Sequence, residues 1–119
     1  MFSFLRRPAD PRPDPRELVR MAESGEAIVI DIREAGEVRA TGKAACALHI
    51  PMATLRTKCD PSCNECAPEL KNDKPVILYC ASGGRASMAA RLMKQLGHKQ
   101  VWNLGGLSHW QAAGGRSAR

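Results

Sequence analysis

The chain has 119 residues, a length typical of one domain with a modest hydrophobic core. Hydrophobic residues make up 44% and charged residues 25%, which are ordinary values for a globular protein. The five cysteines are an odd number, so they cannot all pair within one chain. No stretch approaches the roughly 18 apolar residues of a membrane span. At the N-terminus the positive charges follow the short apolar run, whereas in a secretory signal they precede it. We therefore expect a protein of the reducing cytoplasm that has no membrane partner.

The net charge of +6 is unevenly distributed along the chain. Residues 1–73 hold 11 basic and 12 acidic side chains, whereas residues 74–119 hold seven basic side chains and no acidic one. A positive half attracts anions. Because it lacks interleaved aromatic residues and a dense Lys/Arg tract, we expect no nucleic-acid partner and favour a small anionic substrate.

The first half of the chain predicts alternating helices and strands. Residues 1–13 form a leader rich in Pro and Arg, and the sequence from Asp14 to Glu17 is typical of a helix start. Residues 27–32 are apolar and β-branched, as in a strand buried on both faces. A short helix over 34–40, a weaker strand over 45–50 and one or two helical turns over 52–58 follow.

The second half repeats the alternation. Residues 76–80 predict another buried strand, and residues 84–96 a helix. Its predicted core side carries Met88, Leu92 and Leu96, with Ala89 and Met93 beside them. Residues 101–104 predict a strand, Gly105 and Gly106 a turn, and residues 107–113 a last helix. We therefore predict one α/β domain over residues 14–115, with a central parallel sheet flanked by helices on both faces and a frayed tail over 116–119.

The segment from Cys80 to Ser87 has the pattern of a reactive site. A strand delivers Cys80 into a turn of small residues that opens a helix, so backbone N–H groups and the helix dipole face the thiol. This environment lowers a cysteine pKa and makes the thiolate a nucleophile. Arg85 is placed to hold an oxyanion or to brace the loop. The alternative is a structural cysteine at the end of a buried strand.

Four motifs, in order, resemble the rhodanese family. Residues 80–87 resemble its active loop, Cys-x-x-Gly-x-Arg-Ser/Ala, and residues 29–34 resemble its strand ending in Asp-x-Arg. Residues 47–51 resemble the stretch before the next helix, and residues 101–110 resemble the closing Leu-x-Gly-Gly…Trp. Two turns depart from the family pattern, at residues 42–44 and 46–47.

The resemblance implies a sulfurtransferase that needs no cofactor or metal. Cys80 would be the nucleophile that becomes a persulfide, and Asp31 and Arg33 would support the loop; the alternative for this pair is a surface ion pair. The outer sulfur would be bound by the loop backbone, namely Ala81, Ser82, Gly83, Gly84 and Arg85. The donor would be thiosulfate, a polysulfide or a protein persulfide, and the acceptor a thiol or cyanide. With a single cation in the loop, the choice among these donors stays open.

Two other functions are considered. Cysteine phosphatases and arsenate reductases on a similar scaffold have five residues between Cys and Arg, whereas four separate Cys80 from Arg85. A non-catalytic sulfur carrier or binding module is the other alternative, although such modules usually lose the cysteine.

Three further cysteines, Cys59, Cys63 and Cys66, lie within eight residues. They are candidates for a metal site, for which Cys46 or His49 would have to supply a fourth ligand. Alternatively, Cys63 and Cys66 form a reversible disulfide or relay sulfur from Cys80. The third interpretation is a polar surface loop in which cysteines have no special role.

Overall fold

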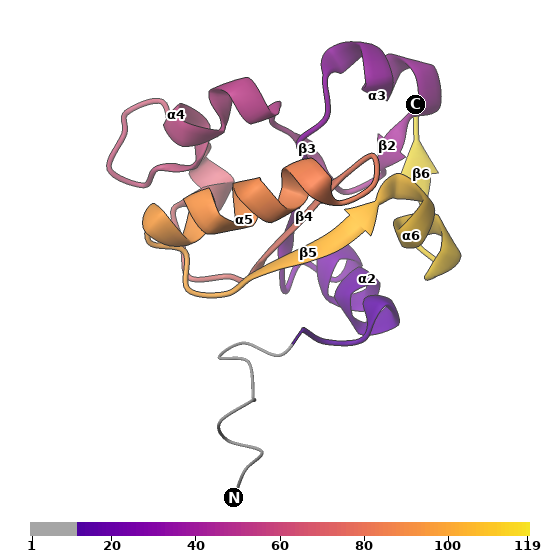
Figure 1. The fold of residues 1–119 in the computed structure, drawn as a ribbon. Helices are drawn as coiled ribbons and strands as arrows, with labels where there is room; N and C mark the ends of the chain where they lie inside the picture. Colours follow the sequence, from indigo (N-terminus) through magenta and orange to yellow (C-terminus); the bar gives the residue numbers. More distant parts are fainter. Residues whose placement is uncertain (1–11) are drawn as a thin grey trace, which may run out of the picture.

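The computed structural model describes residues 12–119 and shows a four-stranded parallel sheet with the order β3-β1-β4-β5. The strands are β1 (Ile28–Asp31), β3 (Leu48–His49), β4 (Val76–Cys80) and β5 (Val101–Gly106). Helices cover both faces of this sheet (Figure 1). The predicted α/β class with a central parallel sheet is therefore confirmed. The predicted leader lies largely outside the described residues.

Alternating side chains of the strands build one core on each face of the sheet. On one face, Ile30, Leu78 and Cys80 pack with α4 (Leu55–Cys59) and α5 (Gly84–Gln95). On the other, Ile77 and Tyr79 pack with α2 (Pro15–Glu23) and α6 (Leu107–Ala112). All five residues of β4 are buried, which explains their continuously apolar sequence. The alternation directs the Cys80 side chain toward α5.

The remaining elements are short. They are α3 (Ala35–Thr41), two 3-10 turns, η1 (Met52–Thr54) and η2 (Pro68–Leu70), and the antiparallel strands β2 (Lys43–Ala44) and β6 (Ser117–Ala118). The prediction of a frayed C-terminal tail was wrong, because β6 pairs with β2 and closes a second, two-stranded sheet. No helix within residues 12–119 is long and apolar enough to cross a membrane.

Two other local predictions were wrong. Met88 is 58% exposed, whereas the core side of α5 consists of Ala86, Ala89 and Met93. Gly105 and Gly106 belong to β5 and do not form a separate turn, because a register shift lets the strand continue past Leu104.

Candidate active site

Cys80 ends β4, at the carboxyl edge of the parallel sheet, where ligands of such folds usually bind. The residue is 1% exposed, and its Sγ accepts a hydrogen bond from the Gly83 backbone N–H at 3.0 Å. The predicted loop residues therefore do curl around the thiol. Burial tends to raise the pKa of Cys80, but N–H groups of Ala86, Gly83, Ser82 and Arg85 outweigh it, so the pKa lies below its ordinary value. This arrangement stabilises a thiolate.

Glycine shapes the loop at two points. Gly83 is the N-cap of α5 and has φ 108°, a left-handed conformation in which a side chain would be strained. Gly106, at the end of β5, lies directly against the Ala81 carbonyl, and a Cβ there would collide with it. The end of β5 therefore supports the first residue of the loop.

Arg85 braces the loop through a residue that the sequence analysis missed. Its guanidinium donates to both carboxylate oxygens of Glu37, at 2.8 and 2.9 Å, from the loop to α3. The hydrogen bond from Arg85, followed by one from the Glu34 N–H, lowers the pKa of Glu37 to about 2. Of the two roles considered for Arg85, bracing is the one that the structure shows. The residues lie 48 positions apart, so no local pattern could reveal the pair.

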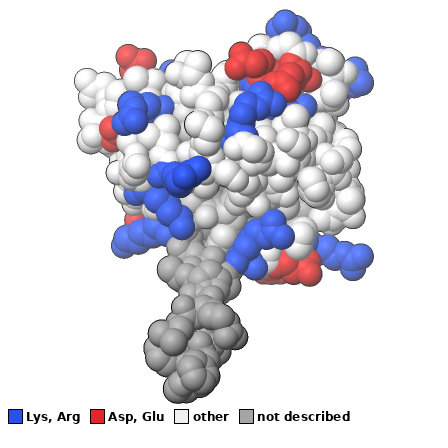
Figure 2. Space-filling view, in the orientation of Figure 1, with Lys and Arg blue, Asp and Glu red and all other residues white. Residues whose placement is uncertain are grey.

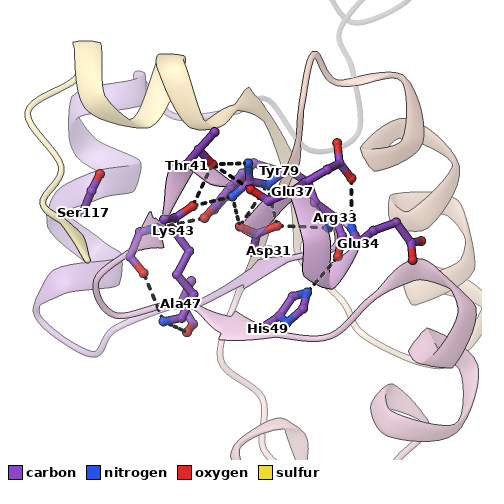
Figure 3. Close-up of polar contacts among 12 residues, drawn as sticks. Asp31, Arg33, Glu34, Glu37, Thr41, Lys43, Ala47, His49, Tyr79 and Ser117 are labelled. Atoms are coloured by element: carbon purple, nitrogen blue, oxygen red, sulfur yellow. Dashed lines mark hydrogen bonds and ion pairs between the residues drawn. The ribbon is translucent and has the colours of Figure 1, made fainter. Parts of the chain in front are cut away.

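Asp31 and Arg33 form a buried ion pair, with side chains 0% and 4% exposed, so the alternative of a surface pair was wrong. Figure 3 shows them clustered with Thr41 and Tyr79. Arg33 donates to both oxygens of Asp31, to Thr41 Oγ1 at 2.8 Å and to the Gly42 carbonyl at 2.7 Å. These contacts hold the end of α3, the helix that carries Glu37. The side-chain hydrogen bonds of Arg33 thus lead to α3, and the predicted support of the Cys80 loop by this pair stays a prediction.

Asn103 is a second residue that the sequence analysis did not single out as a site residue. Its Nδ2 donates to the Gly83 carbonyl and to Ser87 Oγ, both at 3.0 Å, and its Oδ1 accepts from the Gly105 N–H at 2.8 Å. This amide therefore connects β5 to the loop and to the first turn of α5. The position of an Asn two residues before the Gly-Gly pair was the available signal.

The surface around α5 is positively charged. Exposed Arg91 and Lys94 lie on this helix, and residues 74–119 contain no acidic side chain. Figure 2 shows blue side chains spread over this face and red ones toward its margins. The resulting potential favours the approach of anions to the loop.

The cysteine-rich segment is separate from this site. Cys59 and Cys66 are buried in the core beside α5, and Cys63 is half-buried, so the segment is more than a polar surface loop. Burial, reinforced by the neighbouring Cys66, raises the pKa of Cys59 to about 12. Within residues 12–119, no three His, Cys, Asp or Glu side chains converge as metal ligands, so the metal hypothesis is not supported.

The suggested sulfur relay from Cys80 to this segment stays a prediction. His98, which follows α5, hydrogen-bonds the Cys59 carbonyl at 2.7 Å, whereas Cys80 precedes α5. The two groups of thiols therefore lie toward opposite ends of α5, a helix of 12 residues. All five cysteines are free thiols. The suggested disulfide between Cys63 and Cys66 stays a prediction.

Comparisons with known sequences agree with the resemblance of the four motifs. A family model of the rhodanese-like domain matches residues 14–113. A sulfurtransferase of Allochromatium vinosum is 31% identical over 96 residues, which cover 80% of this chain and 81% of that protein. A tRNA uridine(34) hydroxylase of Cronobacter sakazakii is 33% identical over 90 residues, which cover 76% of this chain and 25% of that protein.

Solved structures show the same fold. A human single-domain sulfurtransferase superposes with a TM-score of 0.62 and 26% identity, over 81% of this chain and 90% of that one. A protein of unknown function from Rhodopseudomonas palustris, described as a possible tyrosine phosphatase, superposes with a TM-score of 0.76 and 28% identity. The match covers 87% of this chain and 81% of the Rhodopseudomonas chain.

Proposed function

Because this chain belongs to the family of rhodanese-like domains, as its four motifs indicated, we propose that it transfers sulfane sulfur through a persulfide on Cys80. The observation that carries the proposal is the ring of backbone N–H groups around Sγ, which lowers the pKa of the thiol despite its burial. A group held as a thiolate in this way is both a nucleophile and a good leaving group.

The proposed reaction has two displacement steps. The Cys80 thiolate attacks the outer sulfur of the donor, the donor's S–S bond breaks, and its electron pair leaves with sulfite if the donor is thiosulfate. An acceptor thiolate or cyanide then attacks the outer sulfur of the persulfide, and the electron pair of that S–S bond returns to Sγ. Both leaving groups are stable anions, so the reaction needs neither a metal nor a general base.

The charge of the loop bears on the choice of donor. Glu37 neutralises Arg85, the one cationic side chain between Cys80 and Ser87. The attraction of an anion to the backbone cradle, the N–H groups of residues 82–86 that face Cys80 Sγ, therefore depends on the dipoles of these groups. The pairing of Arg85 with Glu37 leaves the sulfonate end of thiosulfate without a free cationic partner in the loop, whereas a polysulfide or a persulfide has no sulfonate group. We therefore favour a polysulfide or a protein persulfide as the donor. Five free cysteine thiols fit an action in the reducing cytoplasm, the compartment we propose.

A phosphatase activity fits the site less well. A phosphatase uses its loop arginine to bind the phosphate oxygens, whereas the guanidinium of Arg85 is engaged by both oxygens of Glu37. The loop also has four residues, not five, between Cys80 and Arg85. A carrier that only holds sulfur would share the persulfide but would not turn over, so the experiment must measure both.

The test follows thiocyanate formation from cyanide, with thiosulfate or polysulfide as donor, for the wild type and Cys80→Ser. Intact-protein mass spectrometry monitors the addition of one sulfur atom. We expect turnover and an adduct in the wild type and neither in Cys80→Ser, while Cys63→Ser, in the other cysteine segment, behaves as the wild type. An adduct without turnover would indicate a carrier. The absence of both with either donor would contradict the proposed function.

A further inference from the structure

The cysteine segment, residues 59–66, has no role in the proposed reaction at Cys80. It begins at the end of α4 and continues into the loop that follows this helix (Figure 1). Cys59 is fully buried and Cys66 is 5% exposed, and both belong to the hydrophobic core that faces α5. Cys63, between them, is half-buried. The segment thus combines two thiols in the core with a third nearer the surface.

The backbone brings Cys59 and Cys66 together. The Ala67 N–H donates to the Lys58 carbonyl at 2.8 Å, and the two cysteines are the residues immediately inside this hydrogen bond. Neighbours across one backbone hydrogen bond typically have Cα atoms about 4.5–5.5 Å apart. A disulfide requires about 4.4–6.8 Å. Both side chains also enter the same core, so the backbone favours a disulfide between these two residues.

Two turns place Cys63 within reach of Cys66. The Cys63 N–H donates to the Asp60 carbonyl at 2.9 Å, and the Cys66 N–H donates to the Cys63 carbonyl at 3.1 Å. Each bond closes a four-residue turn, whose first and last Cα atoms lie within about 7 Å. Because Cys63 is more exposed than the two buried cysteines, a dissolved reagent reaches it first.

The surroundings of the two buried thiols differ. Burial, followed by the charge of the nearby Cys66, raises the pKa of Cys59 to about 12. Burial also raises the pKa of Cys66, but the positive charge of Lys71 acts in the opposite direction. Cys66 therefore ionises more readily than Cys59, and it is the buried thiol that is better able to attack a disulfide.

We propose that residues 59–66 form a second redox site, which reduces a low-molecular-weight disulfide and is itself oxidised to a Cys59–Cys66 disulfide. This activity goes beyond the proposed function and does not depend on a persulfide at Cys80. The final pair leaves its free thiol at Cys63, where water can solvate it. It also closes a larger loop than a Cys63–Cys66 pair, and a larger loop constrains the unfolded chain more.

The exchange consists of three displacements. The Cys63 thiolate attacks one sulfur of the small disulfide, whose S–S bond breaks and releases the first small thiolate. The Cys66 thiolate then attacks Cys63 Sγ, and the second small thiolate leaves. Finally the Cys59 thiolate attacks Cys66 Sγ, and the electron pair of that S–S bond returns to Cys63. The protein loses two electrons and two protons, and the small disulfide becomes two thiols.

The test uses the full chain with Cys46→Ser/Cys80→Ser, in which only the three thiols of the segment remain. The reduced protein is incubated with oxidised glutathione, and free thiols are then blocked with N-ethylmaleimide. Mass spectrometry examines the tryptic peptide 59–71, which holds all three cysteines because Lys58 and Lys71 flank it. We expect the peptide to lose two hydrogen atoms and to carry one label, on Cys63.

Two variants of this protein test the point of entry. In Cys63→Ser, the Cys59–Cys66 disulfide should form at least about tenfold more slowly, because the buried thiols must react directly with oxidised glutathione. The control is Asn64→Ala, which changes the exposed neighbouring residue and should leave the rate unchanged.

Three results would overturn the proposal. A label on Cys59 would show that Cys63 and Cys66 form the stable pair. Three labels without loss of hydrogen would show cysteines that only fill the core. An equal rate in Cys63→Ser would show that this thiol is not the point of entry. None of these results bears on the proposed function, because the protein tested lacks the Cys80 thiol.

Discussion

Cys80 combines burial with a lowered pKa, two properties that normally oppose each other. Burial in an apolar core raises the pKa of Cys59 to about 12, yet Cys80, which is also buried, shifts in the other direction. The difference is local: backbone N–H groups at the start of α5 point at Sγ. Fixed donors of this kind stabilise a thiolate without exposing it to water.

The loop geometry therefore predicts a particular pH dependence. The single-turnover rate of persulfide formation should rise as Cys80 ionises and reach its plateau at a lower pH than for a free cysteine. Gly83→Ala should move the rise to higher pH, since a Cβ strains the left-handed conformation that aims the Gly83 N–H at Sγ. Gly25→Ala, at another positive-φ glycine far from the loop, is the control. Identical pH profiles for Gly83→Ala and the wild type would contradict the assigned role of this N–H.

Glu37 neutralises the positive charge of Arg85 next to the backbone cradle around Cys80. Its pKa of about 2 lies below the ordinary value, so the stabilisation from its pair with Arg85 is present above pH ~4.5 and is lost as pH falls toward 2. Both side chains are more than a third exposed, which limits the contribution of the pair to stability to about 1 kcal/mol or less.

Glu37→Gln should accordingly change anion binding more than stability. The amide retains a hydrogen bond to Arg85 but no longer neutralises it, so we expect the KM for thiosulfate to fall roughly two- to threefold at low ionic strength. Steady-state kinetics with Glu34→Gln, which removes a neighbouring charge at the N-cap of the same helix, provide the comparison. A rise in KM for Glu37→Gln would show that bracing of the loop matters more than the charge.

At the scale of elements, the pair Asp31–Arg33 fastens β1 to the end of α3. Both charges are removed from water and fully hydrogen-bonded. Arg33→Met leaves the Asp31 carboxylate buried and unpaired, so we expect the free energy of unfolding to fall by about 3–5 kcal/mol. Urea denaturation measures this loss. The double variant Asp31→Asn/Arg33→Met removes both charges and should regain much of it, and a single variant as stable as the wild type would contradict the argument.

The strongly patterned elements could be predicted from the sequence, and the exceptions have physical causes. Strands β1 and β4 were evident because both faces of each are buried. Met88 was misplaced because an apolar residue every four positions drifts around a helix of 3.6 residues per turn. Ala89 and Met93 were correctly placed on the buried face of α5, whereas Ala86 was missed because its small side chain gives a weak hydrophobic signal.

The parts of the site that are contiguous in the sequence could be predicted. The curl of residues 80–85 around the thiol follows from small residues between a strand and a helix, and the sequence shows them directly. Glu37 and Asn103 reach the loop only through tertiary structure, from α3 and from β5. The pairing of β2 with β6 has the same origin, since neither two-residue strand carries a local pattern.

At the scale of the whole molecule, β6 pairs with β2 beside the core that lies on the α2 and α6 side of the main sheet. The Arg116 carbonyl accepts both the indole N–H of buried Trp110 and the Ala45 N–H, each at 2.8 Å. The C-terminal residues thus satisfy two donors, one from α6 and one from the residue that follows β2.

Removal of residues 116–119 should therefore destabilise the fold. The indole N–H of Trp110 loses its acceptor, which costs about 1–3 kcal/mol for a buried donor, and the pairing with β2 is lost as well. We expect Tm to fall by more than about 5 °C, measured by circular dichroism. Removal of Arg119 alone, which keeps the Arg116 carbonyl and both residues of β6, should shift Tm far less. Equal Tm values for the two truncations would show that the Arg116 carbonyl does not stabilise this end of the molecule.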